Sequence, residues 1–248
     1  APTVSASSGA ISVTATGAVS GAGTLTTGLA KADASAGDTT ATSGAISVTA
    51  TGGNIKVGKF TTGAATLLLD NAVTDVATSG NITLSGASIG TNIAGPQTLA
   101  IGTAAKAAGG TATQGVLSMT TTGTGAAGDI YVSSDAALTV KDLTTKVADQ
   151  NTVDIRTTGG KAIATDATGT YTGVAGDGLA YNGDLVTFNT TGASGTVTIA
   201  KALEAGSITI NAADAVTLTA GLTTSAVDTS AAPTVSASSG AISVTATG

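Results

Sequence analysis

The 248-residue sequence contains no cysteine, no histidine and no tryptophan. Small secreted domains often depend on disulfides, whereas a long chain of stacked strands can obtain its stability from strand pairing. The absence of cysteine therefore fits a long chain of stacked strands, and it fits a cytosolic protein equally well. The absence of histidine removes the most common general base from any candidate catalytic site.

Aromatic side chains are also scarce, at 2% of the sequence, and proline occurs only three times. A globular core of this size normally uses aromatic residues, each of which buries about 150–250 Å². Here valine, isoleucine, leucine and alanine have to form the core. The composition therefore favours a narrow core of stacked small side chains over a globular one.

Charged residues make up only 10% of the chain, and the net charge is −6 at pH 7. The eight lysines and the single arginine are scattered and form no basic stripe, so no nucleic-acid partner is predicted. Disordered chains combine low hydropathy with high net charge. The mean hydropathy of this chain is +0.38, which argues against disorder.

The two ends of the sequence are identical, because residues 1–17 (APTVSASSGAISVTATG) return as residues 232–248. The last ten letters of this segment, SGAISVTATG, occur a third time at residues 43–52. Such self-similarity is typical of repeat architectures. We interpret residues 1–248 as a single continuous repetitive segment, one 231-residue period followed by a 17-residue repeat of its start.

No apolar run approaches the ~20 residues of a membrane-spanning helix, so no membrane-spanning segment is expected. The opening residues APTVS are not a basic region followed by a hydrophobic one. We therefore expect either that a signal sequence has been removed or that the sequence is an internal fragment. The identity of the two ends favours the fragment.

Short segments that begin with glycine or a small residue and then alternate polar and aliphatic residues recur along the chain. Examples are GAISV, GNIKV, GNITL, GDIYV, GTVTI and GSITI. This alternation of valine, isoleucine and threonine is typical of strands with one buried face. Five apolar anchors are spaced by 35 or 36 residues: Ile11, Ile46, Ile82, Leu117 and Val153. With two coils in each interval, the pattern predicts strand pairs roughly every 17–22 residues.

Two architectures place short strands at this interval. We predict an all-β fold, a parallel β-helix (β-solenoid) in which each coil of roughly 17–22 residues lies beside the preceding coil. The alternative is a series of tandem β-sandwich modules. Scarce aromatic residues, scarce proline and recurrence at coil length favour the solenoid, and the spread of glycine and β-branched residues argues against helices.

These segments resemble the repetitive β-solenoid shafts of large bacterial surface proteins, of which filamentous-haemagglutinin-like adhesins are the best-known members. The acidic, cysteine-free composition is also similar to that of bacterial surface-layer proteins. The amino-terminal secretion module of the haemagglutinin family is not visible in this sequence. The resemblance implies a right-handed parallel β-helix, display at the cell surface or in a secreted matrix, and a role in adhesion or filament building.

A solenoid leaves unpaired backbone groups at both ends, and monomeric solenoids cover them with atypical capping repeats. Here the terminal segments repeat an interior motif, so we expect self-association or tandem continuation, end to end. The predicted function is an extracellular structural protein that forms a filament, fibre or cell-surface stalk. The alternatives are a surface-layer lattice subunit, and a glycan-binding adhesin or carbohydrate-active enzyme on a β-helix that takes cell-surface or matrix glycans.

No catalytic or cofactor-binding residue is predicted, and we expect no enzymatic activity. Residues 176–184 (GDGLAYNGD) contain Asp177, Asn182 and Asp184, oxygen donors of the type that calcium prefers. Their spacing matches neither an EF-hand nor the calcium-binding nonapeptide of parallel β-rolls. Because turns rich in aspartate, asparagine and glycine also form without an ion, these residues are only candidate calcium ligands.

Four further residues carry possible chemistry. Asn81 and Asn189 begin Asn-Ile-Thr and Asn-Thr-Thr sequons, which are candidate glycosylation sites. Asp154 and Arg156 lie two residues apart, so they share one face of a strand and predict a surface ion pair.

Overall fold

The computed structural model of the chain describes residues 3–33, 37–68, 74–106, 109–146, 150–174, 183–225 and 240–248. Within these ranges the chain forms β-strands and one short 3-10 helix at Gly125–Gly128. Every named pair of strands is parallel. The prediction of an all-β fold with parallel, stacked strands is confirmed. Tandem β-sandwich modules, which pair their strands antiparallel, do not fit this topology.

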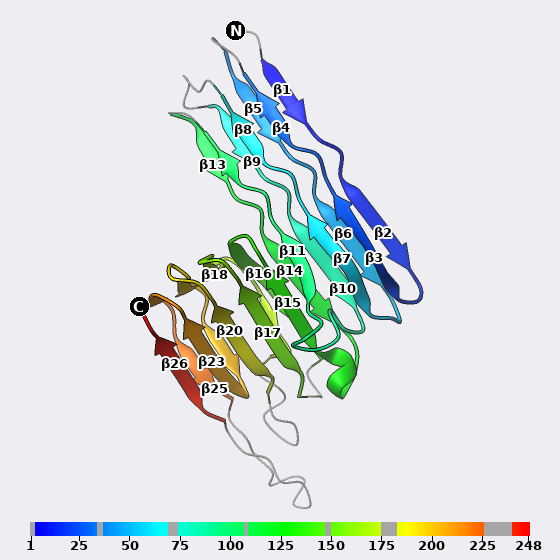
Figure 1. Cartoon of the computed structure of the whole chain (residues 1–248), viewed down its shortest axis with the longest axis vertical. Coiled ribbons are helices and arrows are strands. Elements are labelled where there is room, and N and C mark those ends of the chain that lie inside the picture. Colours follow the sequence, from blue (N-terminus) through cyan, green and yellow to red (C-terminus); the bar gives the residue numbers. More distant parts are fainter. Residues whose placement is uncertain are drawn as a thin grey trace, which may run out of the picture.

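The strands belong to five sheets, called A to E here (Figure 1). Sheet A contains β1 (Val4–Ser7), β5 (Thr39–Thr42), β9 (Val76–Thr78) and β13 (Thr111–Thr113). Sheet B contains β2 (Ile11–Ala15), β6 (Ile46–Ala50), β10 (Ile82–Gly86), β14 (Leu117–Thr121), β16 (Leu138–Thr144), β18 (Ile163–Thr165), β19 (Tyr171–Thr172), β21 (Val197–Ile199) and β24 (Val216–Leu218).

The remaining strands form the opposite layer and one short additional sheet. Sheet C contains β3 (Val19–Thr26), β7 (Ile55–Thr61), β11 (Gln97–Ala100), β15 (Ile130–Ser134), β17 (Thr152–Thr157), β20 (Leu185–Thr190), β23 (Ser207–Ala212) and β26 (Ile242–Ala246). Sheet D contains β4 (Ala30–Ala32), β8 (Ala65–Leu67) and β12 (Ala104–Ala105), and sheet E contains β22 (Leu203–Ala205) and β25 (Leu222–Thr224).

In its first three coils the chain passes through sheets A, B, C and D in turn before it returns to sheet A. Sheet A contacts sheet D, and sheet B contacts sheet C, so each of these coils is two layers thick. Figure 1 shows β1 and β2 in line along one side of this wide part of the molecule. From β15 onward the described chain alternates between sheets B and C, with β22 and β25 of sheet E beside them, and the coils are narrower.

Alternation along each strand decides which side chains enter the core. In β6, Ile46 and Val48 are buried, whereas Ser47 and Thr49 are partly exposed on the outer face. The inner rows of sheets B and C face each other and form one apolar core along the molecule. Its largest fully buried side chain is phenylalanine, which occurs once in the wide coils and once in the narrow ones. The core is therefore built almost wholly from aliphatic rows, as the composition predicts.

A second and smaller core lies between sheets A and D. It consists mostly of alanine: Ala30, Ala32, Ala41, Ala65, Leu67, Ala77 and Ala104. Alanine side chains fill little volume, so two layers that pack through them must approach closely. Sheets A and D with this core form an extension to the main core of sheets B and C. The extension is the clearest case of the narrow core that the scarcity of large side chains predicts.

The spacing of the anchors reflects the length of a wide coil. Ile11, Ile46, Ile82 and Leu117 pair directly with one another in sheet B, each with the next anchor along the chain. Between two anchors the chain also forms strands of sheets C, D and A, which belong to the same coil. The shorter coil that the sequence predicts is therefore not found in this half, because the anchor interval contains one coil and not two.

Shorter returns occur after the strands of sheets A and D end. In the narrow part Leu185 pairs with Ser207 in sheet C, and Val197 pairs with Val216 in sheet B. Only pairings such as these two, in the narrow part, have the separation of roughly 17–22 residues that the sequence predicts. The reason is that a narrow coil omits the two strands that extend the wide coil.

The fifth anchor, Val153, is assigned wrongly by the sequence pattern. Leu117 pairs with Val140 of β16 in sheet B, and Val153 pairs with Ile130 in sheet C. The chain turns at residues 135–137 from β15 directly into β16 and so shortens the coil. After this turn a constant period no longer places equivalent residues in the same sheet.

Columns of glycine run from coil to coil between the two cores. Gly44, Gly80 and Gly115 each lie against the glycine of the preceding coil, and a Cβ on any of them would overlap the carbonyl oxygen of that glycine. The N–H of Gly80 donates a hydrogen bond to Ser43 Oγ at 2.7 Å, and that of Gly115 donates to Ser79 Oγ at 2.6 Å. The Ser-Gly pair thus connects each coil to the next.

The opposite layer uses threonine in the same way. The N–H of Gly63 donates to Thr27 Oγ1, and that of Gly102 donates to Thr62 Oγ1, each at 3.0 Å. The hydroxyl of Thr27 donates in turn to the carbonyl oxygen of Gly44 at 2.8 Å, which joins the two layers. These buried hydroxyls satisfy backbone groups that lie between strands and have no ladder partner.

Candidate functional site

The ends of sheets B and C each present a strand with one unpaired edge in the described structure. β2 is the first strand of sheet B, and β26 is the last strand of sheet C (Figure 1). At the β26 end the inner apolar row is uncovered: Ile242 is 42% exposed, Val244 is 44% exposed, and Leu218 of β24 is 50% exposed. Equivalent rows in the interior are fully buried. This end is therefore a surface suited to one more layer of strands.

The same five residues, ISVTA, form β2, β6 and β26, but these strands lie in different surroundings. β2 and β6 are neighbours in sheet B, whereas β26 is in sheet C. The residues of β6 alternate between buried and partly exposed, and all five residues of β26 are exposed. The first copy of the terminal repeat therefore enters sheet B, whereas the second copy enters sheet C.

Of the three candidate calcium ligands, Asp184 is described, and Asp177 and Asn182 lie outside the described residues. The carboxylate of Asp184 is fully buried just before β20. Its Oδ2 accepts a hydrogen bond from the Thr145 hydroxyl at 2.6 Å, and its Oδ1 accepts one from the backbone N–H of Asn151 at 2.9 Å. Both oxygens are therefore used within the protein.

Burial raises the pKa of Asp184 to about 6, because the charged form loses its hydration. The hydrogen bonds from Thr145 and Asn151 act in the opposite direction, and the negative charge of Asp129 adds to the rise. Among the described residues no group of three or more acidic, histidine or cysteine side chains is placed to hold a metal ion. Asp184 is thus a buried titratable group held by neutral donors.

Asp154 and Arg156 form the predicted ion pair. Nη2 of Arg156 lies 2.9 Å from Oδ2 of Asp154, and Nε contacts Oδ1, so the guanidinium binds both carboxylate oxygens. The hydrogen bonds that Arg156 donates to Asp154 raise the pKa of Arg156. The pair differs from a simple surface pair in one respect: the Asp154 side chain is only 6% exposed. Two donors in a fixed fork compensate for its lost hydration.

The two sequons lie in different settings. Asn81 is exposed immediately before β10, and its Oδ1 accepts a hydrogen bond from the N–H of Val116 at 2.9 Å. Asn189 lies within β20, partly buried, and pairs in register with Arg156 and Asn211 of the neighbouring strands. Asn81 is therefore the more accessible of the two side chains.

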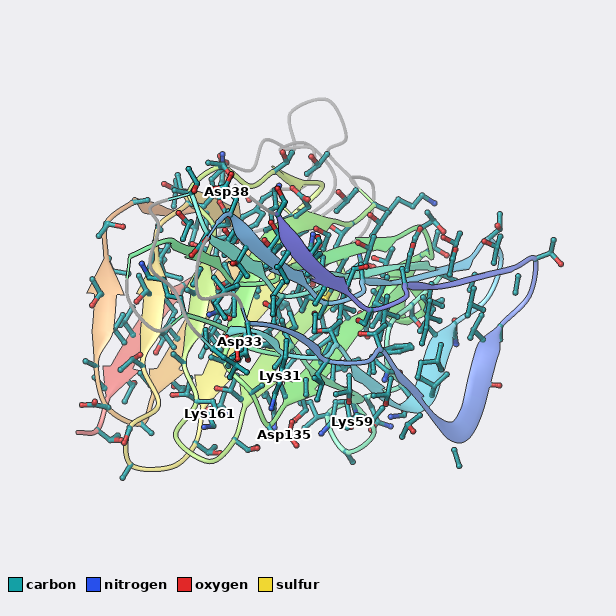
Figure 2. All side chains as sticks on the ribbon, turned by 90° about the horizontal axis from the view of Figure 1, so that it is seen from above. Lys31, Asp33, Asp38, Lys59, Asp135 and Lys161 are labelled. Atoms are coloured by element: carbon teal, nitrogen blue, oxygen red, sulfur yellow. The ribbon has the colours of Figure 1, made fainter. Side chains whose placement is uncertain are left out.

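A cleft of about 380 Å³ opens where the wide coils give way to the narrow ones. Its lining includes the apolar side chain of Ile101 and the polar side chains of Gln114, Asp135 and Lys161. Figure 2 shows Lys59, Asp135 and Lys161 on the same side of the molecule. The cleft exists because the chain turns back at residues 135–137 and leaves the extension of sheets A and D standing beside the turn.

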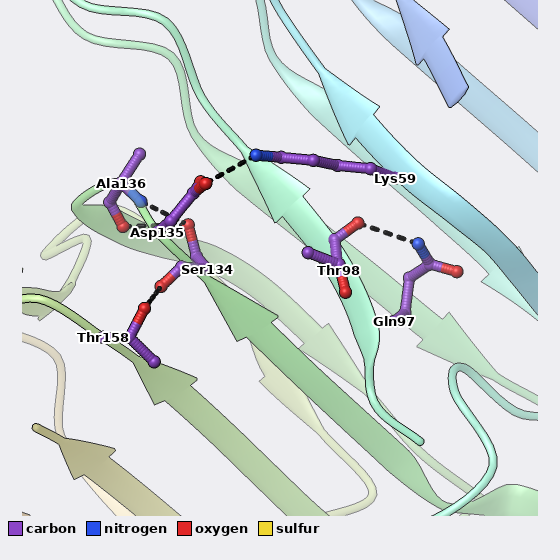
Figure 3. A network of polar contacts seen from close by, with 7 residues as sticks. All are labelled: Lys59, Gln97, Thr98, Ser134, Asp135, Ala136 and Thr158. Carbon is purple, nitrogen blue, oxygen red and sulfur yellow. Dashed lines mark hydrogen bonds and ion pairs between the residues drawn. The ribbon is translucent and has the colours of Figure 1, made fainter. Parts of the chain in front are cut away.

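An exposed ion pair lies at the edge of this cleft. Nζ of Lys59, on β7, lies 2.6 Å from Oδ2 of Asp135, which follows β15 (Figure 3). In the same turn the hydroxyl of Ser134 accepts a hydrogen bond from the N–H of Ala136 and donates to its carbonyl oxygen. The ion pair crosses two strand steps of sheet C, since β11 lies between β7 and β15.

Sequence reasoning missed the residues that connect the coils. Ser43 and Ser79 were not predicted to have a role, although each is followed by glycine and lies shortly before an anchor isoleucine. The repeated Ser-Gly pair was the available signal. Thr145, Asn151 and the burial of Asp184 had no signal in the sequence, because they come together from separate coils.

Comparison of the chain with protein-family models, with curated proteins and with solved structures finds no match. In the described ranges no helix is long and apolar enough to cross a membrane.

Proposed function

We propose that the chain is an extracellular structural protein that forms a filament, fibre or cell-surface stalk. Its coils form a parallel β-helix, and copies of the chain continue one another end to end. The protein has no catalytic role. The observation that carries this proposal is the row of aliphatic side chains in sheets B and C, which runs along the whole molecule and ends uncovered at β24 and β26.

Sheets B and C contribute the same kind of interaction in every coil, wide or narrow. Each added coil pairs a set of backbone groups and buries an inner aliphatic row, which contributes about 25 cal/mol per Å² of apolar area removed from water. The same interactions then recur at every step, so the stability and stiffness of the rod rise with its length. A stiff rod is suited to a mechanical task.

The extracellular assignment is supported by the composition. The chain is acidic, and its repeated segments resemble the shafts of bacterial surface proteins. Threonine and serine cover the outer faces of the strands, as in β6, so the rod presents hydroxyl groups to water.

A second candidate function is the binding of cell-surface or matrix glycans on the same scaffold. The cleft of about 380 Å³ favours it, because Gln114, Asp135 and Lys161 offer donors and acceptors for sugar hydroxyls beside the apolar Ile101. Titration of the chain with defined oligosaccharides, monitored by the chemical shifts of Lys161 and its neighbours, tests this candidate. Unchanged spectra at saturating sugar would eliminate it.

The filament proposal is tested by assembly of the purified chain. We expect light scattering to rise with protein concentration, and electron microscopy to show unbranched rods. Fibre diffraction of aligned rods should give a reflection at ~4.8 Å along the rod axis, since the strands lie across it. A chain that remains monomeric in sedimentation up to its solubility limit would refute the proposal.

A further inference from the structure

The outer faces of sheets A and B carry hydroxyl side chains in an ordered array. The strands from β1 to β13 in sheet A, and from β2 to β14 in sheet B, pair in parallel without a register shift. Their outward positions therefore form two columns on each sheet. On sheet A the columns are Ser5, Thr40, Val76 and Thr111, and Ser7, Thr42, Thr78 and Thr113; on sheet B they are Ser12, Ser47, Thr83 and Ser118, and Thr14, Thr49, Ser85 and Thr120.

We call these four columns the hydroxyl face. Val76 is its one side chain without a hydroxyl group. β1 and β2 lie in line (Figure 1), so the columns of sheet A and those of sheet B follow one another along the direction of the strands. The face therefore extends over both the main core and the extension of sheets A and D.

The opposite layer of the same coils shows that this array is not a requirement of the fold. Threonine is favoured on the outward side of any strand, and sheets C and D also carry some. They carry Lys31 on β4, and Lys56 and Lys59 on β7, as well. Figure 2 shows Lys31 and Lys59 on the same side of the molecule. The hydroxyl face has no charged side chain, and Asp38, before β5, and Asp142, on β16, lie only at its borders.

The hydroxyl groups of this face are available to water. Among them, in the part of the chain that the structure describes, only Ser118 bonds to another protein group, donating to Oδ2 of Asp142 at 2.9 Å. Elsewhere threonine hydroxyls are used within the fold, as Thr27 and Thr145 show. The face thus presents unshared donors and acceptors to the solvent.

The β-sheet sets the spacing of these groups. Neighbouring members of a column lie ~4.8 Å apart, and successive outward positions of one strand lie ~6.6 Å apart. Oxygen atoms on a prism face of hexagonal ice repeat at similar distances in two perpendicular directions. Threonine is stiff at χ1, and strands paired on both sides hold its backbone in place. The array is therefore ordered before it meets a partner, which lowers the entropic cost of binding.

We infer that the hydroxyl face is an ice-binding surface, and that its ligand is the ordered water at the surface of an ice crystal. Short side chains on a sheet cannot enclose a soluble ligand, so the partner has to be flat and periodic. Crystalline polysaccharide also has these properties, but it is typically bound through aromatic rings, and the hydroxyl face has none. The absence of charge favours ice, because a charged group orients water around itself and not along a lattice.

The inference goes beyond the filament proposal and does not depend on it. A single chain presents the whole face, so a monomer and a rod would both bind ice. On a cell-surface stalk, the face would attach the cell to ice.

Partition into ice tests the inference. Ice that grows slowly from a dilute solution excludes ordinary proteins and takes up those that adsorb to its surface. The chain can be labelled with a fluorophore at its lysines, none of which belongs to the hydroxyl face. We expect the ice to take up the native chain, and the chain to slow the recrystallisation of fine-grained ice. Exclusion of the native chain from the ice would overturn the inference.

Two threonines of adjacent strands provide a matched pair of variants. Thr78→Lys places a charge within the hydroxyl face and should abolish uptake into ice. Thr66→Lys is the control, because Thr66 is also partly exposed, on β8, which contacts β9 from the opposite layer. Thr66→Lys should be taken up like the native chain. Circular dichroism spectra and melting temperatures establish that both variants fold.

Thr113→Lys keeps the test decisive if Thr78→Lys folds poorly. Thr113 is exposed on β13, the last strand of sheet A, so a lysine there can extend into water without disturbing the core. We expect this variant to lose uptake into ice as well.

The remaining outcomes each overturn the inference. Equal uptake of Thr78→Lys and Thr66→Lys, or loss of uptake by both folded variants, would show that ice does not contact this face. Binding of the native chain to cellulose powder and not to ice would make the partner a crystalline polysaccharide. If Thr78→Lys altered sedimentation of the chain and left ice uptake unchanged, the face would be a contact between copies. The filament proposal is decided separately, by assembly.

Discussion

The hydroxyl of Ser43 accepts a hydrogen bond from the backbone N–H of Gly80, one coil further along the chain, at 2.7 Å. Both groups lie between the two cores and are buried. The contact is repeated by Ser79 and Gly115 in the next coil. Serine therefore supplies the acceptor that a regular ladder would otherwise provide where two sheets of one layer meet.

Ser43→Ala removes this acceptor and leaves a buried N–H without a partner. We expect the free energy of unfolding to fall by about 1–3 kcal/mol, the cost of an unsatisfied buried polar group. Ser12→Ala is the matched control, because Ser12 is exposed on β2 and its replacement should change stability by less than about 0.5 kcal/mol. Urea denaturation of both variants provides the measurement. Equal midpoints would show that water replaces the serine hydroxyl.

Gly80→Ala tests the close approach of adjacent coils. The added methyl group would overlap the carbonyl oxygen of Gly44, so the two coils must separate. We expect a loss of about 1–3 kcal/mol, as for other overpacked positions. Gly17→Ala is the control, since a methyl group at Gly17 meets no atom within 4 Å. If thermal unfolding placed the two variants at the same temperature, the spacing of the coils would not depend on glycine.

The three ISVTA strands allow one substitution to be compared in three settings. Ile46 is fully buried, Ile11 packs partly against the core, and Ile242 is 42% exposed. In the monomer, Ile46→Ala should cost about 2–5 kcal/mol. Ile242→Ala should cost less than about 1 kcal/mol, with Ile11→Ala between them. Chemical denaturation of the three variants gives the order of their losses in unfolding free energy. A larger loss at Ile242 than at Ile46 would contradict the exposed position of β26 at the end of sheet C.

Asp184 predicts an unusual dependence of stability on pH. Its pKa is about 6 in the folded chain, above the ordinary value of 3.8, so folding favours the protonated form. Above pH 6 the charged carboxylate destabilises the fold. As the pH falls from about 6 towards 3.8, the folded state takes up a proton that the unfolded state does not, and the free energy of unfolding rises.

Asp184→Asn should remove this rise and should be more stable than the native chain at pH 7. Asp135→Asn serves as a control, because Asp135 is an exposed partner of Lys59. The difference in unfolding free energy between the native chain and Asp184→Asn, measured from pH 4 to pH 7, isolates the effect from other carboxyl groups. A native chain that loses stability relative to Asp184→Asn as the pH falls through this window would show that the hydrogen bonds dominate burial.

Strand formation was predictable because it is a local property. The alternation in ISVTA or GNITL specifies which residues face inward wherever the segment lies. The anchors Ile11, Ile46, Ile82 and Leu117 stack in parallel, but with one coil in each interval and not the two coils that the sequence predicts. The prediction fails at Val153, since a period counts residues and does not reveal that the chain has omitted two strands.

The candidate sites were less predictable. Asp184 was selected for its oxygen donors, yet its burial and its contacts with Thr145 and Asn151 come from other coils of the chain. The cleft beside Asp135 and Lys161 likewise arises from a change in coil width, for which no motif exists.

Period-two alternation and β-branched residues act locally, so the short parallel strands and their aliphatic inner rows can be predicted from the amino-acid sequence. The assembled fold alone sets which sheet each strand enters, how long each coil is, and why one pentapeptide is buried at Ile46 and exposed at Ile242. The physical reason is that burial and sheet membership depend on what the preceding and following coils place beside a strand.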